Sequence, residues 1–144
     1  MRYVCDASER LAWFRLETEG EAVSESVETH AGVAYFFREA RRTALLSYRP
    51  RADLSFFERD IGLEAHIQRA MPLFLTLRDR DGTALVTAML PPAGKDSGSH
   101  SIFVWGAGGV DPYESHALAL QVLETKFDLS IIDRMDDGHC LCLV

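Results

Sequence analysis

The stretch 73–90 constrains the fold most, because it carries the clearest β-hairpin pattern in the chain. Leu73, Leu75 and Leu77 alternate with other side chains, which is typical of a strand with two different faces. The dipeptide Asp81-Gly82 then supplies a tight turn, and the apolar residues after it predict a returning strand. We therefore expect an antiparallel strand pair in the middle of the chain.

A capping-box pattern predicts where the first helix begins. Thr18 is followed three residues later by Glu21, a spacing at which each side chain can bind a backbone N–H group of the first helical turn. The helical pattern runs to residue 48, but Gly32 interrupts it, and a glycine inside a helix costs about 1 kcal/mol relative to alanine. The sequence therefore leaves open whether residues 19–48 form one helix or two.

The other expected elements follow from apolar spacing, turn residues and prolines. The expected strands are 2–6, 11–17, 101–105, 129–133 and 139–144, and the expected helices are 61–70 and 112–127. Residues 53–58 are ambiguous. The order of strand pairs and helices predicts an α+β fold, a largely antiparallel mixed sheet with helices packed mainly on one face. A chain of 144 residues suits one core, so we expect a single domain over residues 1–144.

The composition is that of a folded soluble protein, with 47% hydrophobic and 26% charged residues. No stretch approaches the roughly 20 apolar residues of a membrane-spanning helix, so no membrane partner is expected. Three cysteines are too few for a disulfide-stapled domain and no signal-peptide pattern is found, so we expect a cytoplasmic location. The formal net charge of −7 disfavours nucleic acid as a partner.

Three closely spaced glycines stand between a strand-like and a helix-like segment, which is the order of many phosphate-binding loops. Gly106 and Gly108 fit the dinucleotide pattern, but Asp111 stands where the third glycine belongs, and no P-loop lysine and hydroxyl follow. Asp111, Pro112 and Glu114 suit the first turn of a helix, where the two carboxylates would repel an anion. We therefore expect a structural turn, and no cofactor.

The cysteines and histidines give little support for a metal site or a catalytic group. Cys140 and Cys142 would share one face of a strand, whereas His139 would point to the opposite face. With Cys5 these residues would be the ligands of a zinc ion, but the C-x-x-C spacing of such sites is missing. No paired histidine motif or G-x-S-x-G motif occurs either. No metal is expected, and the catalytic residues stay unknown.

Positive charge is concentrated in one short segment. Arg38, Arg41, Arg42, Arg49 and Arg51 lie close together in the sequence, and the first three share one side of a helix. Forked guanidinium groups suit a carboxylate or a phosphate, so these five arginines are candidate anion-binding residues. The glutamates that precede them could instead pair with them if the chain folds back at a break in the helix. An anion site and an internally paired surface are therefore both open.

The helix expected over 112–127 carries two apolar strips. Leu118 and Val122 project from a different side than the rest of its apolar residues. This second strip could be buried by another element of the chain or by a second copy of it. The pattern favours a homodimer.

These observations predict a small protein that acts by binding, without catalysis, either a partner protein or a small anionic ligand. The alternative is a small enzyme that acts on an acidic small-molecule substrate. In that case Arg38, Arg41 or Arg42 would orient the substrate, and a histidine such as His100 would act as acid or base. The enzyme hypothesis requires arginine and histidine to converge in one pocket.

Overall fold

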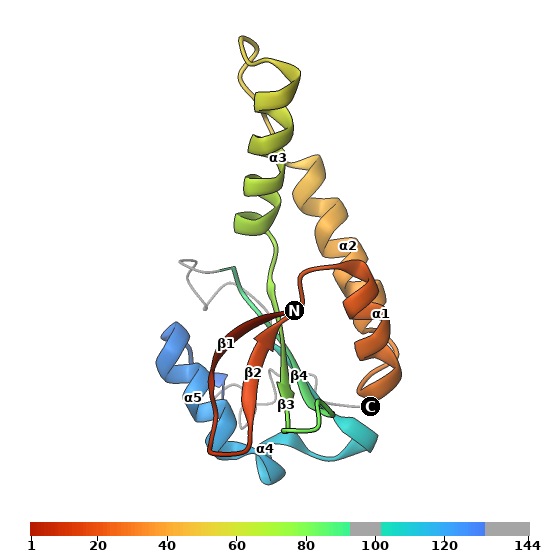
Figure 1. Cartoon of the computed structure of the whole chain (residues 1–144), viewed down its shortest axis with the longest axis vertical. Coiled ribbons are helices and arrows are strands. Elements are labelled where there is room, and N and C mark those ends of the chain that lie inside the picture. Colours follow the sequence, from red (N-terminus) through yellow and green to blue (C-terminus); the bar gives the residue numbers. More distant parts are fainter. Residues whose placement is uncertain (93–101, 132–144) are drawn as a thin grey trace.

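The computed structural model describes residues 1–92 and 102–131 of the chain. Within these residues, five strands form one sheet, and their order in space is their order in the sequence (Figure 1). The strands are β1 (Arg2–Asp6), β2 (Ala12–Arg15), β3 (Leu73–Arg78), β4 (Ala84–Leu90) and β5 (Phe103–Gly106). The helices are α1 (Glu19–Glu28), α2 (Val33–Leu46), α3 (Phe56–Ala70), α4 (Pro112–Ser115) and α5 (Ala117–Phe127), with a 3-10 turn, η2 (Ala107–Gly109), after β5. Neighbouring strands pair antiparallel, which confirms the α+β class.

The hairpin of β3 and β4 forms as its sequence predicts. Its register places Leu73 opposite Leu90 and Leu77 opposite Val86. In the turn, the Asp79 carboxylate accepts hydrogen bonds from the N–H groups of Asp81 and Thr83, at 2.9 and 3.0 Å. Gly82 has a φ of 84°, a conformation that residues with a Cβ atom seldom adopt. The carboxylate of Asp79 and the left-handed conformation of Gly82 therefore set this turn.

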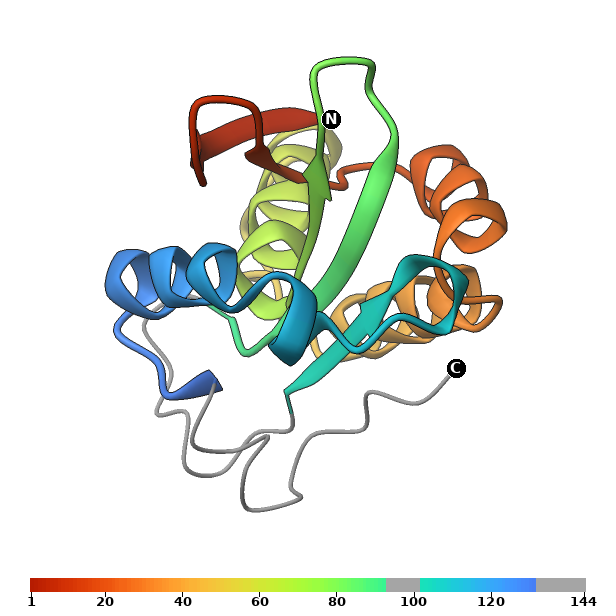
Figure 2. The ribbon, with the colours of Figure 1, turned by 90° about the horizontal axis from the view of Figure 1, so that it is seen from below.

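Helices cover both faces of the sheet, as the view along the strands shows (Figure 2). On one face, α5 packs on a core that includes Trp13, Leu75, Leu77, Val86 and Val104. On the other face, α1, α2 and the base of α3 pack on a second core that includes Leu16, Phe74 and Trp105. Most of the helical residues lie on this second face, and α5 adds the layer opposite to it.

The segment 19–48 forms two helices rather than one. The capping box at its start is confirmed, because the Thr18 hydroxyl accepts from the N–H of Glu21 and the Glu21 carboxylate accepts from the N–H of Thr18. The chain leaves helical geometry after Glu28 and resumes it at Val33. The break therefore includes Gly32, the position at which the sequence suggested a division.

Three other expectations need correction or lie outside the described residues. The third helix begins at Phe56, five residues earlier than expected, because Ser55 and Glu58 form a second capping box. The strand expected over 129–133 is wrong in its described part, because residues 129–131 form no strand. The Ile131 N–H instead donates to the Glu124 carboxylate at 2.9 Å, and the Ile131 side chain is buried. The strand expected over 139–144 lies outside the described residues.

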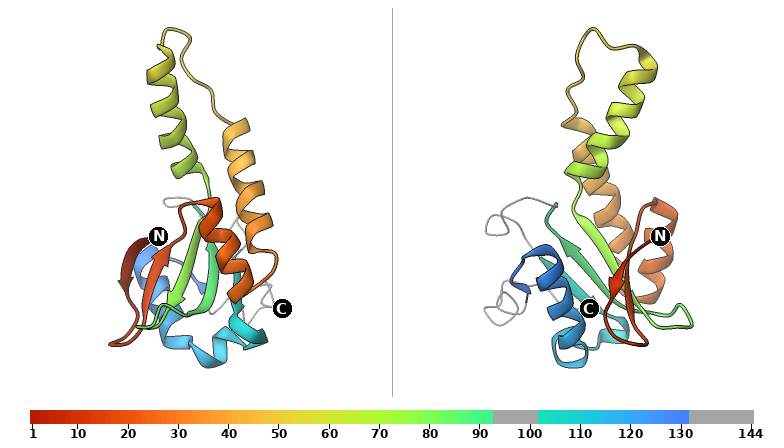
Figure 3. Two further views of the ribbon diagram at one scale, coloured as in Figure 1. Left: turned by 45° about the vertical axis from the view of Figure 1, so that its right-hand side comes forward. Right: turned by 60° about the vertical axis from the view of Figure 1, so that its left-hand side comes forward.

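The helices α2 and α3 form a hairpin that projects beyond the sheet, as two further views agree (Figure 3). Its chain leaves the sheet after β2 and returns at β3, and these two strands are direct neighbours. The last residue of α2 in the core is Ala44. The first buried residue of α3 is Ile67, and the half-buried Leu63 packs against the same core. The part of the hairpin between Ala44 and Leu63 therefore stands outside the core.

Candidate partner-binding surface

The projecting hairpin is held together by a contact between an aromatic ring and a glycine. The hydroxyl group of Tyr48 packs so closely on Gly62 that a Cβ atom there would lie 2.5 Å from the Tyr48 oxygen. The same hydroxyl donates a hydrogen bond to the carbonyl of Arg59 at 3.2 Å, and the Tyr48 ring lies 5.3 Å from the ring of His66. A helix without a side chain at position 62 therefore lets the two antiparallel helices approach each other.

A second polar contact joins the helices one turn nearer the sheet. Nε2 of His66 lies 2.8 Å from the Ser47 hydroxyl oxygen and 3.1 Å from the carbonyl oxygen of Ala44. The Ser47 hydroxyl donates to the same carbonyl at 2.8 Å. Because a carbonyl oxygen only accepts, Nε2 is assigned as the protonated nitrogen of this histidine. His66 thus caps the end of α2 from the neighbouring helix.

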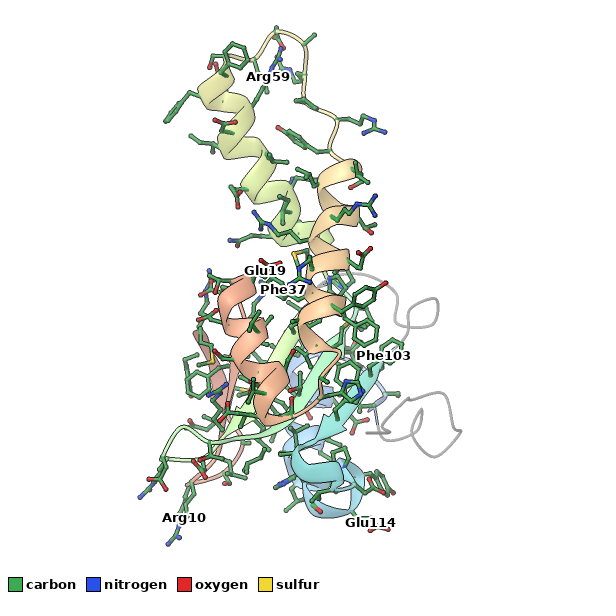
Figure 4. All side chains as sticks on the ribbon, turned by 90° about the vertical axis from the view of Figure 1, so that its right-hand side faces the viewer. Arg10, Glu19, Phe37, Arg59, Phe103 and Glu114 are labelled. Carbon is green, nitrogen blue, oxygen red and sulfur yellow. The ribbon has the colours of Figure 1, made fainter. Side chains whose placement is uncertain are left out.

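Arginines complete the caps at the far end of the hairpin. Nη1 of Arg49 donates to the carbonyl oxygens of Leu46 and Tyr48, each at 2.9 Å, which satisfies carbonyl groups that the end of α2 leaves free. Nη2 of Arg59 donates to the carbonyl of Ala52 at 2.8 Å, and Figure 4 shows Arg59 at the far end of the hairpin. The connecting loop is therefore fastened to both helices by its polar groups.

Large apolar side chains remain exposed at this capped end. Phe56 is 86% and Phe57 is 73% exposed, whereas buried phenylalanines of the cores are almost inaccessible. Among the described residues, twelve large hydrophobic side chains are exposed, and five of them lie in the last turn of α2 or the first two turns of α3. We call these five the apolar tip: Leu45, Leu46, Phe56, Phe57 and Ile61. Clustered exposed apolar side chains mark interaction sites, whereas scattered ones need no explanation.

Each arginine of the candidate anion site has a partner within the chain. Arg38 binds Glu19 at 2.6 Å, Arg41 binds Glu64 at 3.4 Å and Arg42 lies 3.7 Å from Glu39. Arg51 binds Asp53 through two nitrogens, at 3.2 and 2.8 Å, and Arg49 binds the two carbonyl groups described above. Of these partners, only Glu19 belongs to the acidic segment that the sequence suggested.

The five arginines are spread along the hairpin rather than gathered at one point. Arg38, Arg41 and Arg42 lie in α2, whereas Arg49 and Arg51 lie in the connection that follows it. Arg41 lines a cleft between α2, α3 and the end of β2, together with Arg15, Glu64 and Gln68. This cleft holds about 50 Å³, compared with roughly 300–1,000 Å³ for typical ligand pockets. Burial and then the nearby Arg2 lower the pKa of Arg15 in this cleft, and its Nη2 donates to the Gln68 carbonyl at 3.2 Å.

The histidines of the described residues are engaged in the fold. No histidine is among the described residues that line the Arg41 cleft. The ring of His30 stacks on Trp105 with a centroid distance of 5.0 Å, and its Nδ1 accepts from the N–H of Gly32 at 3.0 Å. His100, the histidine of the enzyme hypothesis, lies outside the described residues.

The three glycines after β5 each have a conformational role. A Cβ atom at Gly106 would lie 2.0 Å from the carbonyl oxygen of Val110, so only glycine lets the two backbone segments come this close. Gly108 and Gly109 have φ values of 66° and 77°, which favour glycine. The Asp111 carboxylate accepts from the N–H of Tyr113 at 2.9 Å and caps α4. The backbone geometry alone thus explains this motif.

In the described part of the chain, no group of three or more histidine, cysteine, aspartate or glutamate side chains could hold a metal ion. Cys140, Cys142 and His139 lie outside that part. None of the described helices is long and apolar enough to cross a bilayer. Comparisons with protein-family models, curated proteins and solved structures found no match.

Proposed function

We propose that this protein is a non-catalytic binding module, and that the apolar tip of the α2–α3 hairpin is the surface that binds a partner protein. The observation that carries the proposal is that five large apolar side chains, two in the last turn of α2 and three in the first two turns of α3, are exposed on the projecting hairpin. Burying one such side chain contributes about 1.5–3 kcal/mol, and aromatic side chains dominate the energy of many interfaces. Two adjacent phenylalanines therefore suit the centre of an interface.

The caps around the tip support binding without large rearrangement. Tyr48, Arg49 and Arg59 fix the loop and both helix ends by hydrogen bonds to backbone carbonyls. Ordering flexible side chains and loops on binding costs free energy, so a loop that is already fastened keeps more of the gain from burial. The apolar tip is then a preformed projection that would fit into a groove on the partner protein.

Charge around the tip favours a partner groove with an acidic rim. Residues 41–61 contain five arginines and three carboxylates, a net charge of +2 on a chain whose net charge is −7. Mixed charges favour a protein over an anionic bilayer, whose headgroups would repel Asp53, Glu58 and Asp60. A partner protein is also favoured over a small anionic ligand, because the cleft beside Arg41 is small and each candidate arginine has a partner in the chain.

Two further parts of the proposal concern location and assembly. We place the module in the cytoplasm, which the free thiol of Cys5 supports. We also propose self-association, supported by Leu118, which is 74% exposed on α5.

The enzyme alternative depends on His100 and is not favoured by the surroundings of the described histidines.

Site-specific photo-crosslinking in cells tests the tip directly. A photoreactive phenylalanine at position 57 should give a discrete crosslinked product, and Phe56→Ser with Ile61→Ser in the same chain should abolish it. The matched control carries the photoreactive residue in place of Val27, which is 85% exposed on α1 and lies outside the tip. The same products from positions 27 and 57 would contradict the proposal.

A bilayer is the competing partner, and a vesicle assay separates the two. Wild-type protein should not sediment with vesicles of phosphatidylcholine and phosphatidylserine. Sedimentation that Phe56→Ser/Phe57→Ser abolishes would replace the protein partner by a lipid surface.

A further inference from the structure

The helix α5 uses one of its two apolar sides to pack on the sheet. Ala119, Leu120 and Leu123 are buried in the core. The indole N–H of Trp13 donates to the carbonyl of Ala119 at 3.0 Å, which fixes the rotation of the helix about its axis. Leu118 is therefore held on the outer side, where 74% of it is exposed.

A groove lies beside Leu118, between α5 and the edge strand β1. Its volume is about 540 Å³, and it is lined by Cys5, Ala7, Leu118, Gln121, Val122, Thr125 and Lys126. Lys126 is the one charged residue among these described lining residues, and Leu118, Val122 and Thr125 follow each other one helical turn apart. The groove is thus an apolar strip with a cation at one end.

The same patch offers both a projecting side chain and a hollow to receive it. A two-fold interface requires this kind of self-complementarity, because each surface meets an identical copy of itself. Two α5 helices that cross antiparallel would bring Leu118 of each copy over the groove of the other. The apolar tip, by contrast, adjoins neither described cleft of α2 and α3, because none of its residues lines them.

The charges at the two ends of α5 fit the antiparallel arrangement. Lys126 lies in the last turn of α5, whereas the exposed Glu114 lies in α4, directly before the first turn of α5. An antiparallel crossing brings Lys126 of one copy toward Glu114 of the other, and a parallel crossing would place like charges together. Edge-to-edge pairing of β1 is less suitable, because its register shifts between Tyr3 and Cys5 and such bulges hinder strand addition.

We propose that a second copy of this chain covers the groove between α5 and β1, with Leu118 of each copy seated against Val122 and Cys5 of the other. This inference rests on the self-association part of the proposed function and is independent of the apolar tip. It names the interface and its symmetry, and it makes Lys126 and Glu114 the charged pair at its ends.

Oligomeric state across a micromolar concentration series tests the interface. Sedimentation should show a monomer–dimer equilibrium for the wild type and a monomer for Leu118→Glu, while Val27→Glu on α1 should still dimerise. Lys126→Glu should weaken the dimer, and Lys126→Glu combined with Glu114→Lys should restore it. Unchanged thermal unfolding of diluted Leu118→Glu protein would show that the loss of dimer is not a loss of fold.

Protection of Cys5 locates the interface independently. In a Cys140→Ser/Cys142→Ser background, maleimide labelling of Cys5 should slow as the protein concentration rises, and Leu118→Glu should remove this protection. A dimer that neither protects Cys5 from labelling nor responds to Leu118→Glu would overturn the named surface while self-association stands. A wild-type monomer at all concentrations would overturn both, and the crosslinking result at position 57 would be unaffected.

Discussion

The carboxylate of Glu25 on α1 accepts a hydrogen bond from Nη2 of Arg78 on β3, at 2.7 Å, beneath a helix that covers the sheet. Glu25 is completely buried, and it also accepts from the hydroxyl group of Thr87, which lies 2.6 Å from the hydroxyl of Thr29. The ion pair and its two threonines thus join α1 to two neighbouring strands through a polar contact inside an apolar layer.

Glu25→Gln is expected to destabilise the protein substantially. The substitution keeps the shape of the side chain but leaves the largely buried Arg78 without its main charged partner, and loss of one member of a buried pair costs roughly 3–5 kcal/mol. Urea unfolding measures the change. Glu28→Gln is the matched control, because Glu28 is more exposed and lies 3.4 Å from the same guanidinium, so its loss should cost less than about 1 kcal/mol. Equal effects of the two substitutions would contradict this view.

The effect of Gly62→Ala should change sign with the residue at position 48. In the wild type, the new methyl group meets the Tyr48 hydroxyl oxygen, so the hairpin should lose stability. In a Tyr48→Phe background that oxygen is gone and the nearest ring carbon is 3.6 Å away, so alanine should stabilise α3 by up to about 1 kcal/mol. Thermal unfolding of the four combinations provides the test, and additive effects would argue against the contact.

Stability should fall at mildly acidic pH because of His116. Burial lowers the pKa of His116 in the folded state, so the unfolded chain binds a proton more readily than the folded chain. The stabilisation from neutral His116 is therefore complete above its unfolded pKa of about 6.5 and is lost as pH falls through the lower folded pKa. His116→Gln should flatten the dependence of the unfolding temperature on pH in this range. If the unfolding temperatures of the variant and the wild type depend on pH in the same way, His116 is not the cause of the loss of stability.

Charge reversal of Arg41 and Arg42 tests the anion-binding prediction. Both guanidinium groups already lie beside carboxylates, so a thermal-shift screen with anionic metabolites should give the same responses for the wild type and for Arg41→Glu/Arg42→Glu. A saturable stabilisation by one anion that the variant loses would instead support an anion site on α2.

Local signals in the sequence predict much of this fold. The turn at Asp81-Gly82 and the capping box at Thr18 form as expected, because each depends on atoms within a few residues. The capping box at Ser55 is a signal of the same kind, and it accounts for a start of α3 earlier than apolar spacing alone predicts. The strand expected around residue 131 does not form in its described part. The Ile131 N–H donates to the Glu124 carboxylate, and the Ile131 side chain is buried in the core on which α5 packs.

The candidate surface could not be predicted in the same way. Apolar residues such as Phe56 and Phe57 are expected to be buried, and only the projection of the hairpin leaves them in solvent. The arginines were visible in the sequence, but their partners were not, because Arg41 and Glu64 meet only when α2 and α3 pack together. Burial and pairing are properties of the assembled hairpin rather than of any short segment.

Because α2 contributes no core residue beyond Ala44 and α3 none before Leu63, the arm between them is an appendage of the fold rather than a part of its framework. Whole helical turns could be removed from both of its helices, or added to them, while the paired strands at its base stayed in register. The distance that the arm spans is thus free to vary, so one sheet could serve partners whose grooves lie at different depths.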